Sequence, residues 1–167
     1  AGAATDAFGN TRSFDGAATG QYQINVTASA APRDDAGNDT HTRTRVSAGR
    51  PLSGAIEYDG DVDVYRFSAH SGEQYTITLA GSGSTALNDP FLRIVDRDGN
   101  ELGGNDDGED GTLNSSFVFT PTRGGDVFIE ARSYGDTGQG GYTLNIATTR
   151  LPPENASADT NTRARVN

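Results

Sequence analysis

The chain has 167 residues, enough for one domain with extensions, and carries a formal net charge of -10 with a pI near 4.4. An acidic surface repels a phosphate backbone, which excludes nucleic acid as a favoured partner and indicates cations instead. The absence of Cys excludes disulfides and thiol chemistry. No run approaches the roughly 18 apolar residues of a membrane span, and neither a signal peptide nor an initiator Met is present. We therefore expect a mature or excised segment without membrane insertion.

Short apolar runs with alternating patterns, separated by turn residues, predict an all-β chain. Seven or eight such runs joined by tight turns are typical of an antiparallel β-sandwich in which one face of each strand points inward. The predicted strands span residues 52–58, 62–68, 74–80, 91–95, 116–120, 126–132 and 141–147.

Alternation also predicts the core, because residues two apart on a strand share a face. Truncating Phe117 to Ala is expected to cost roughly 3–5 kcal/mol if its ring is buried. The predicted core consists of Tyr65, Phe67, Ile77, Leu79, Leu92, Ile94, Phe117, Phe119, Val127, Ile129, Leu144 and Ile146.

An internal repeat frames these strands. Residues 1–47 align without a gap on residues 121–167, so that, for example, Tyr22 falls on Tyr142. Such a register indicates a tandem array of modules about 120 residues long.

The repeat divides the chain into three parts. We predict that residues 1–30 hold the C-terminal strands of an upstream repeat, 34–149 form one complete module, and 154–167 begin the next repeat. The apolar strand expected at 22–27 would then lack its own sandwich, so both flanks are expected to pair with neighbouring copies. The alternatives are disordered flanks, or an N-terminal flank that folds back onto its own module.

Two acids stand where the second predicted strand begins. Asp61 and Asp63 are two residues apart and repel each other, and a hard cation such as calcium, which takes six to eight oxygen ligands, would relieve that repulsion. Two solvated turn acids without an ion are the alternative.

A longer acidic region runs from residue 88 to residue 110. Its Asp96-Arg97-Asp98-Gly99-Asn100 segment opens like an EF-hand loop, but Glu101 occupies the position that needs Gly, so a hairpin turn is the simpler interpretation. The run from Asn105 to Asp110 carries four acids in six residues, which favours a counter-ion over a solvated loop.

Several motifs in a fixed order resemble the bacterial pre-peptidase C-terminal domain family, over residues 34–149. They are Asn38-Asp39-Thr40, Gly60-Asp61-Val62-Asp63-Val64-Tyr65-Arg66-Phe67, Asp89-Pro90-Phe91-Leu92-Arg93-Ile94, Asp98-Gly99-Asn100, Asn105-Asp106-Asp107-Gly108 and Gly141-Tyr142-Thr143-Leu144.

The resemblance implies a jelly-roll-like β-sandwich that is secreted and non-catalytic, in a family that includes clostridial collagen-binding modules. In those modules calcium lies between an acidic linker and the loop before the strand that starts Asp-x-Asp. The positions that match here are Asp34, Asn38, Asp39, Asp61 and Asp63, while Ala36 replaces a linker acid of the collagen-binding relatives.

The sequence therefore predicts calcium as the cofactor. The expected metal residues are Asp34, Asn38, Asp39, Asp61, Asp63, Asp89, Asp106 and Asp107. No catalytic residues are predicted, because neither His has metal spacing and no Gly-x-Ser-x-Gly elbow occurs.

Three functions are open at this point. The first is a calcium-stiffened spacer, filament-forming or adhesive repeat of a large secreted or cell-surface protein. The second is a targeting module that binds collagen-like protein or polysaccharide for an attached hydrolase, favoured if Tyr58, Tyr134 and Tyr142 form an exposed aromatic strip. The third is a hydrolase, which would need a deep pocket with a perturbed acid.

Overall fold

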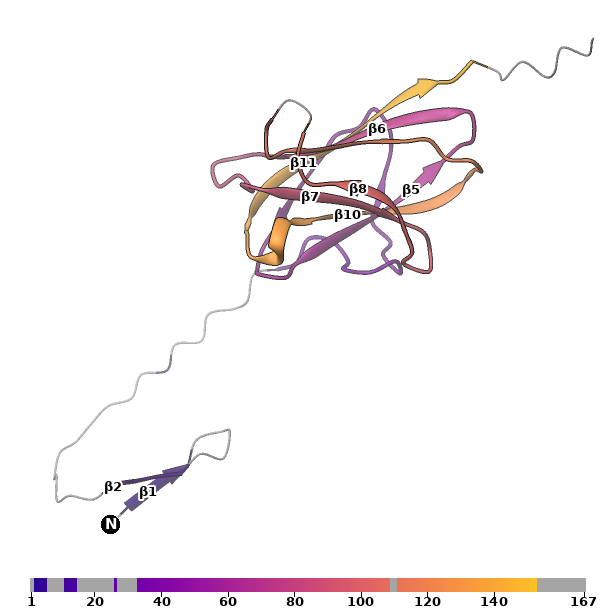
Figure 1. Cartoon of the computed structure of the whole chain (residues 1–167). Coiled ribbons are helices and arrows are strands. Elements are labelled where there is room, and N and C mark those ends of the chain that lie inside the picture. Colours follow the sequence, from indigo (N-terminus) through magenta and orange to yellow (C-terminus); the bar gives the residue numbers. More distant parts are fainter. Residues whose placement is uncertain (1, 6–10, 15–25, 27–32, 109–110, 153–167) are drawn as a thin grey trace, which may run out of the picture. The chain divides into compact units, whose positions relative to one another are not determined.

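The computed structural model describes residues 2–5, 11–14, 26, 33–108 and 111–152 (Figure 1). The chain divides into two units, Ala1–Ala31 and Pro32–Asn167, each of which is described by itself. Among the described residues, no helix is both long enough and apolar enough to cross a membrane.

The N-terminal unit contains a small hairpin. Strand β1 (Gly2–Thr5) pairs antiparallel with β2 (Thr11–Phe14). Of the strand expected at residues 22–27 only Val26 is described, and its side chain is 87% exposed; the segment 154–167 lies outside the described residues. The division into repeats and the pairing of the flanks with other copies therefore stay predictions.

The second unit contains two sheets. One is five-stranded, with the order β3-β5-β10-β7-β8, and all of its pairs are antiparallel except the parallel pair β3 and β5. Its strands are β3 (Arg45–Val46), β5 (Val62–Ala69), β10 (Gly125–Ser133), β7 (Pro90–Val95) and β8 (Glu101–Asn105).

The second sheet is four-stranded and fully antiparallel, with the order β4-β11-β6-β9. Its strands are β4 (Leu52–Ile56), β11 (Gly140–Arg150), β6 (Glu73–Gly81) and β9 (Ser115–Phe119). A single 3-10 turn, η1 (Tyr134–Asp136), follows β10. The prediction of an all-β antiparallel sandwich is confirmed, and β3 and β8 are strands that the sequence did not predict.

The core lies between the two sheets, on the predicted faces. All the predicted core residues are buried except Phe117, which is half-buried and packs against the core. The strand register inferred from alternation is therefore correct.

Strand β8 was missed because its sequence, Glu-Leu-Gly-Gly-Asn, resembles a turn. The structure explains the first of these glycines. A Cβ on Gly103 would lie 2.3 Å from Cζ of Phe117, and its φ is +152°. The glycine thus makes room for an aromatic ring from the facing sheet.

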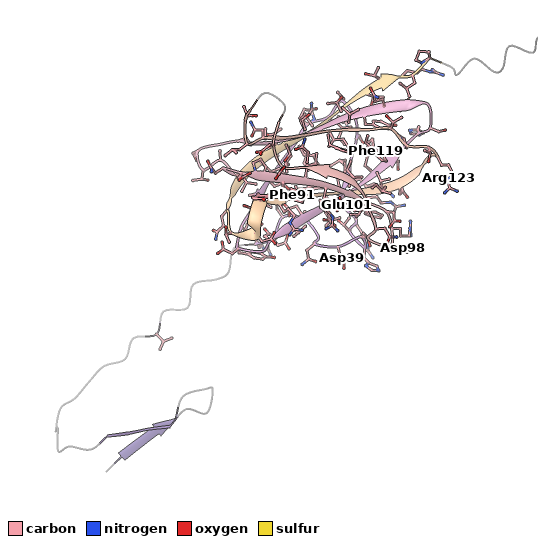
Figure 2. All side chains as sticks on the ribbon, viewed as in Figure 1. Asp39, Phe91, Asp98, Glu101, Phe119 and Arg123 are labelled. Atoms are coloured by element: carbon pink, nitrogen blue, oxygen red, sulfur yellow. The ribbon has the colours of Figure 1, made fainter. Side chains whose placement is uncertain are left out.

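A small apolar cluster lies on the outer face of the five-stranded sheet. It consists of Val64, Val95 and Phe128, with Val62 packed against it. The segment before β3 is anchored over this region, because the Thr40 hydroxyl donates to the Arg97 carbonyl at 3.0 Å. Accordingly Asp39, in that segment, and Asp98, in the β7–β8 turn, lie near each other (Figure 2).

The chain enters and leaves this unit at opposite ends. Strand β5 begins beside the end of β10, where Val62 faces Arg132. Strand β11 ends at Arg150, which faces Glu73, and the Leu151 amide donates to the Gly72 carbonyl at the other end of the sandwich. In Figure 1 the segment of residues 33–44, called the linker below, begins at one end of the sandwich, and β11 ends at the other.

Candidate metal centre

Four carboxylates meet where the linker reaches the sandwich. Asp34 comes from the linker, Glu57 follows β4, Asp61 ends the β4–β5 loop, and Asp63 lies in β5. One oxygen from each lies within 4.8 Å of the others, and this is the group of candidate metal ligands that the described residues contain. A cation at this point could bind the linker and two segments of the sandwich together.

The two aspartates of the loop and strand are almost fully buried. Asp63 is 0% exposed and Asp61 is 2% exposed. Within the described structure, Asp61 Oδ1, Asp63 Oδ1 and Glu57 Oε2 are buried and have no hydrogen-bond partner. Buried carboxylate oxygens without donors are costly, and a bound cation would satisfy them.

The remaining oxygens of the two aspartates are held by protein donors. The Glu57 amide donates to Asp61 Oδ2 at 2.8 Å. The Tyr142 hydroxyl donates to Asp63 Oδ2 and lies 2.6 Å from the Tyr65 hydroxyl. Each aspartate is therefore oriented by one oxygen while the other has no protein donor.

Gly54 of β4 makes room for the two tyrosines. A Cβ there would lie 2.5 Å from the Tyr142 hydroxyl and 2.9 Å from the Tyr65 hydroxyl. We expect Gly54→Ala to destabilise the module by about 1–3 kcal/mol, the usual cost of overpacking. Urea unfolding followed by circular dichroism would measure this, with Gly124→Ala as a control because its nearest Cβ contact is an ordinary 3.5 Å. An unchanged midpoint for Gly54→Ala would contradict the packing described.

The metal-free cluster is electrostatically strained. Burial is the main cause that raises the pKa of Asp63 to about 7, and the charges of Asp35, Asp61 and Asp34 add to it. Burial, followed by the hydrogen bond to Asp61 and nearby carboxylate charges, raises the pKa of Glu57 to about 8. At neutral pH, these groups compete for protons unless a cation supplies positive charge.

This strain predicts an unusual pH dependence for the metal-free protein. The pKa values of Asp63 and Glu57 are raised in the folded state, to about 7 and about 8, so the unfolded chain releases these protons first as pH rises. The contribution of these two groups to the free energy of unfolding should therefore be largest below about pH 4 and should decrease between about pH 4 and pH 8. Denaturant unfolding with chelator across this range would test the sign. Asp63→Asn should flatten the decline, and a metal-free stability that rises from pH 5 to pH 8 would contradict it.

Of the two other residues expected at this site, Asp39 lies outside the four-carboxylate group, and Asn38 is an amide rather than a carboxylate. Asp39 is exposed, and its Oδ1 accepts the His41 amide at 2.8 Å. Asn38 is also exposed. Their role as ligands stays a prediction.

The other expected acids, Asp89, Asp106 and Asp107, do not belong to that group. Burial, then the charges of Asp107 and Asp106, raise the pKa of Asp89. In the described part of this loop they form no set of ligand atoms as close as the one around Asp61. A second metal site there stays a prediction.

Glu57 is the ligand candidate that the sequence analysis missed. It belongs to a series of acids at every second position, Glu57, Asp59, Asp61 and Asp63, of which only the last two were considered. Asp59 does not belong to the group of four, and accepts a hydrogen bond from Gln139 at 2.9 Å.

The segment that opens like an EF-hand is a hairpin turn between β7 and β8. Asp96 Oδ1 accepts the amides of Asp98 and Asn100 at 2.8 and 2.9 Å. These bonds, together with that from the Asn100 side chain, lower the pKa of Asp96. The Asp96 carboxylate thus stabilises the turn by accepting these hydrogen bonds, as the hairpin interpretation predicts.

Tyr58, Tyr134 and Tyr142 do not form the exposed aromatic strip that would favour a targeting module. Tyr58 and Tyr134 are exposed, but Tyr142 is fully buried in the hydrogen-bonded group around Asp63. Tyr134 instead packs edge-on against Phe91, with ring centroids 6.4 Å apart.

Three comparisons with known proteins were informative to different extents. Solved structures that resemble it include the pre-peptidase C-terminal domain of a collagenase from Bacillus anthracis (15% identity, 69% of this chain, 97% of that chain, TM-score 0.49). Two periplasmic inhibitors of g-type lysozyme are also similar: PliG from Aeromonas hydrophila (16% identity, 64% and 95% covered, TM-score 0.47) and PliG from Salmonella Typhimurium (15% identity, 68% and 100% covered, TM-score 0.41). No curated protein matches the chain. Residues 61–133, from the first buried acid to the end of β10, match the bacterial pre-peptidase C-terminal domain family, which confirms the resemblance over that segment.

Proposed function

We propose that residues 34–149 form a non-catalytic, calcium-binding module of a secreted or cell-surface protein, acting as a spacer or adhesive element that calcium stiffens. The observation that carries this proposal is the meeting of linker Asp34 with Glu57, Asp61 and Asp63 within 4.8 Å. The family match over residues 61–133 is consistent with it.

Calcium suits this set of ligands better than other common metals. All four side chains offer carboxylate oxygens, which hard cations prefer, and none is a His or Cys of the kind that zinc selects. Magnesium usually keeps several waters and binds one or two protein carboxylates, whereas calcium accepts six to eight oxygens in flexible geometry. Four carboxylates from three separate segments, completed by water, fit calcium.

The proposed mechanism is mechanical. Asp34 belongs to the linker, and nearby Gly37 already bridges to Val64, whose amide donates to the Gly37 carbonyl at 2.8 Å. A cation shared by Asp34 and the sandwich acids would fix the linker upstream of that bridge. Because the chain enters and leaves the module at opposite ends, fixed linkers would turn a series of such modules into a stiff rod.

Neighbouring copies of the same repeat are the proposed partners of such an array. Strand exchange through residues 1–30 and 154–167 would add to the calcium-fixed joints. The alternative of a targeting module for collagen-like protein or polysaccharide lacks the three-tyrosine strip that would have favoured it, because Tyr142 is buried.

Hydrogen–deuterium exchange of the linker tests the mechanical role. We expect calcium to slow amide exchange at residues 33–37, because the ion would hold Asp34 against the sandwich. Asp34→Asn should remove most of this protection, while the β7–β8 hairpin at residues 96–100 serves as an internal control. Calcium that slows exchange in the sandwich but leaves the linker unchanged would contradict the stiffening role.

A further inference from the structure

A basic pocket lies on the outer face of the five-stranded sheet of this acidic chain. Four arginines, Arg43, Arg45, Arg66 and Arg97, line a hollow of about 340 Å³ above Phe128. The whole chain has 13 basic and 23 acidic residues, so this gathering of arginines opposes the overall charge. Thr40, His41 and Thr42 complete its wall.

The pocket is held by hydrogen bonds that fix its arginines close together. The Thr40 hydroxyl donates to the Arg97 carbonyl at 3.0 Å, and the Arg66 amide donates to the Thr44 carbonyl at 2.9 Å. Arg45 of β3 is the direct register partner of Arg66 of β5. Like charges on adjacent strands repel unless a counter-charge lies between them.

One carboxylate partly supplies that counter-charge. Asp126 accepts a hydrogen bond from Arg66, and Arg97 Nη2 lies 3.9 Å from Asp126 Oδ2. Arg66, Ser68 and Arg45 contribute to a pKa of about 2 for Asp126, the reverse of the raised pKa values at the metal centre. Among the described residues, Arg43 and Arg45 have no carboxylate within ion-pair distance. In the described structure, Asp126 is therefore the one carboxylate that pairs with the four arginines of the pocket, and their positive charge is compensated only in part.

We propose that this arginine pocket binds an oxyanion, namely a sulfate, phosphate or carboxylate group, either free or carried by a larger molecule. Guanidinium groups donate paired hydrogen bonds to such anions. The Thr42 hydroxyl accepts the Thr44 amide at 3.2 Å and still has its own hydrogen to donate. Arg66 is already oriented by Asp126, so the pocket needs little rearrangement to accept a ligand.

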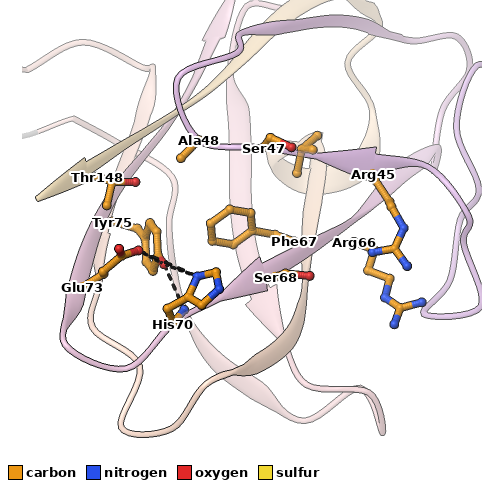
Figure 3. A pocket seen from close by; sticks show the side chains of 11 residues that line it. Arg45, Ser47, Ala48, Arg66, Phe67, Ser68, His70, Glu73, Tyr75 and Thr148 are labelled. Atoms are coloured by element: carbon orange, nitrogen blue, oxygen red, sulfur yellow. Dashed lines mark hydrogen bonds and ion pairs between the residues drawn. The ribbon is translucent and has the colours of Figure 1, made fainter. Parts of the chain in front are cut away.

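A second hollow beside the basic pocket could accommodate the rest of a larger ligand. It measures about 370 Å³ and shares Arg45 and Arg66 with the basic pocket. Figure 3 shows these two arginines side by side at one end of the hollow, and Phe67 between them and Tyr75. An anionic group in the basic pocket could therefore continue as a neutral chain or ring across this surface.

The pocket is separate from the proposed calcium site. Asp63 points to the inner face of β5 with Tyr65 and Phe67, whereas Arg66 points to the outer face. Oxyanion binding can thus be measured with calcium saturating or removed, and failure of one site would not imply failure of the other.

Titration of the whole chain with sodium sulfate, followed by amide NMR at low ionic strength, tests the proposal. We expect saturable shifts at residues 40–45, 66 and 97. Arg43→Gln and Arg97→Gln should each weaken binding about tenfold, as expected for the loss of a charge-assisted hydrogen bond. Arg123→Gln is the matched control, because this exposed arginine lies outside the basic pocket (Figure 2).

The other outcomes are also decisive. A sulfated disaccharide that binds more tightly than sulfate, with the same dependence on Arg43 and Arg97, would indicate an anion carried by a larger molecule, and equal affinity would indicate a free ion. Linear, non-saturating shifts, or equal effects of Arg123→Gln and Arg43→Gln, would overturn the proposal. A third result would also overturn the proposal: the chain binds no sulfate but self-associates at low salt, and Arg43→Gln abolishes that self-association. The occupant of the pocket would then be a second copy of the chain.

Discussion

Removing calcium is expected to lower the midpoint of thermal unfolding by about 10 °C at neutral pH. Calcium that binds only the folded state at 100 times its dissociation constant adds about 2.7 kcal/mol, which corresponds to a shift of this size in a domain of this length. The physical reason is that one buried carboxylate oxygen of each of Glu57, Asp61 and Asp63 has no donor in the described structure. Without the ion, like charges and unsatisfied acceptors remain in the fold.

Scanning calorimetry in calcium and in chelator would measure this shift. Asp61→Asn should remove most of the calcium dependence, since Asp61 is 2% exposed and belongs to the group of four. Asp98→Asn is the matched control, because Asp98 is an exposed acid of the β7–β8 turn. Equal midpoints in calcium and chelator for the unmodified chain would contradict a stabilising ion.

The second large effect is expected in the core of the five-stranded sheet. Ile129 lies in the middle of β10, between β5 and β7, and is 0% exposed. Ile129→Ala should cost about 2–5 kcal/mol, because it removes buried methyl groups and leaves a cavity that neighbouring strands cannot fill. Urea unfolding with calcium present would give the difference.

Two further variants calibrate that measurement. Val118→Ala, on the exposed face of β9, should change stability by less than about 0.5 kcal/mol. Phe117→Ala should cost less than the roughly 3–5 kcal/mol of a fully buried phenylalanine, because its ring is half-buried. An Ile129→Ala cost no larger than that of Val118→Ala would contradict the assigned register.

Most of the fold was predictable from the sequence because alternation is a local signal. The patterns at Tyr75, Ile77 and Leu79, and at Leu144 and Ile146, place the same side chains inward as the structure does. Strand β8 was not predictable in this way, because Gly103 makes room for the ring of Phe117, which is fourteen residues away in sequence and lies on the other sheet. Strand β3 has only two residues, too few for a period to be read.

The candidate metal centre was predictable only in part. Asp61 and Asp63 stand out as a spaced pair before a strand, and the family resemblance added Asp34. Glu57 belongs to a series of alternating acids that also contains Asp59, and only the folded structure shows that Glu57 joins the group of four while Asp59 does not. The same holds for Tyr142, whose donation to Asp63 joins residues 79 positions apart.

The basic pocket could not be predicted from the sequence. Its arginines come from the linker, β3, β5 and the β7–β8 turn, and no spacing along the chain relates them. Their meeting depends on the bond between Thr40 and the Arg97 carbonyl, a contact between residues 57 positions apart.

Isothermal titration of the calcium-free chain with calcium tests the central claim most directly. The account predicts saturable binding at the centre formed by Asp34, Glu57, Asp61 and Asp63, lost in Asp61→Asn and kept in Asp98→Asn. Saturable binding that survives in Asp61→Asn, or no binding by the unmodified chain at millimolar calcium, would contradict it.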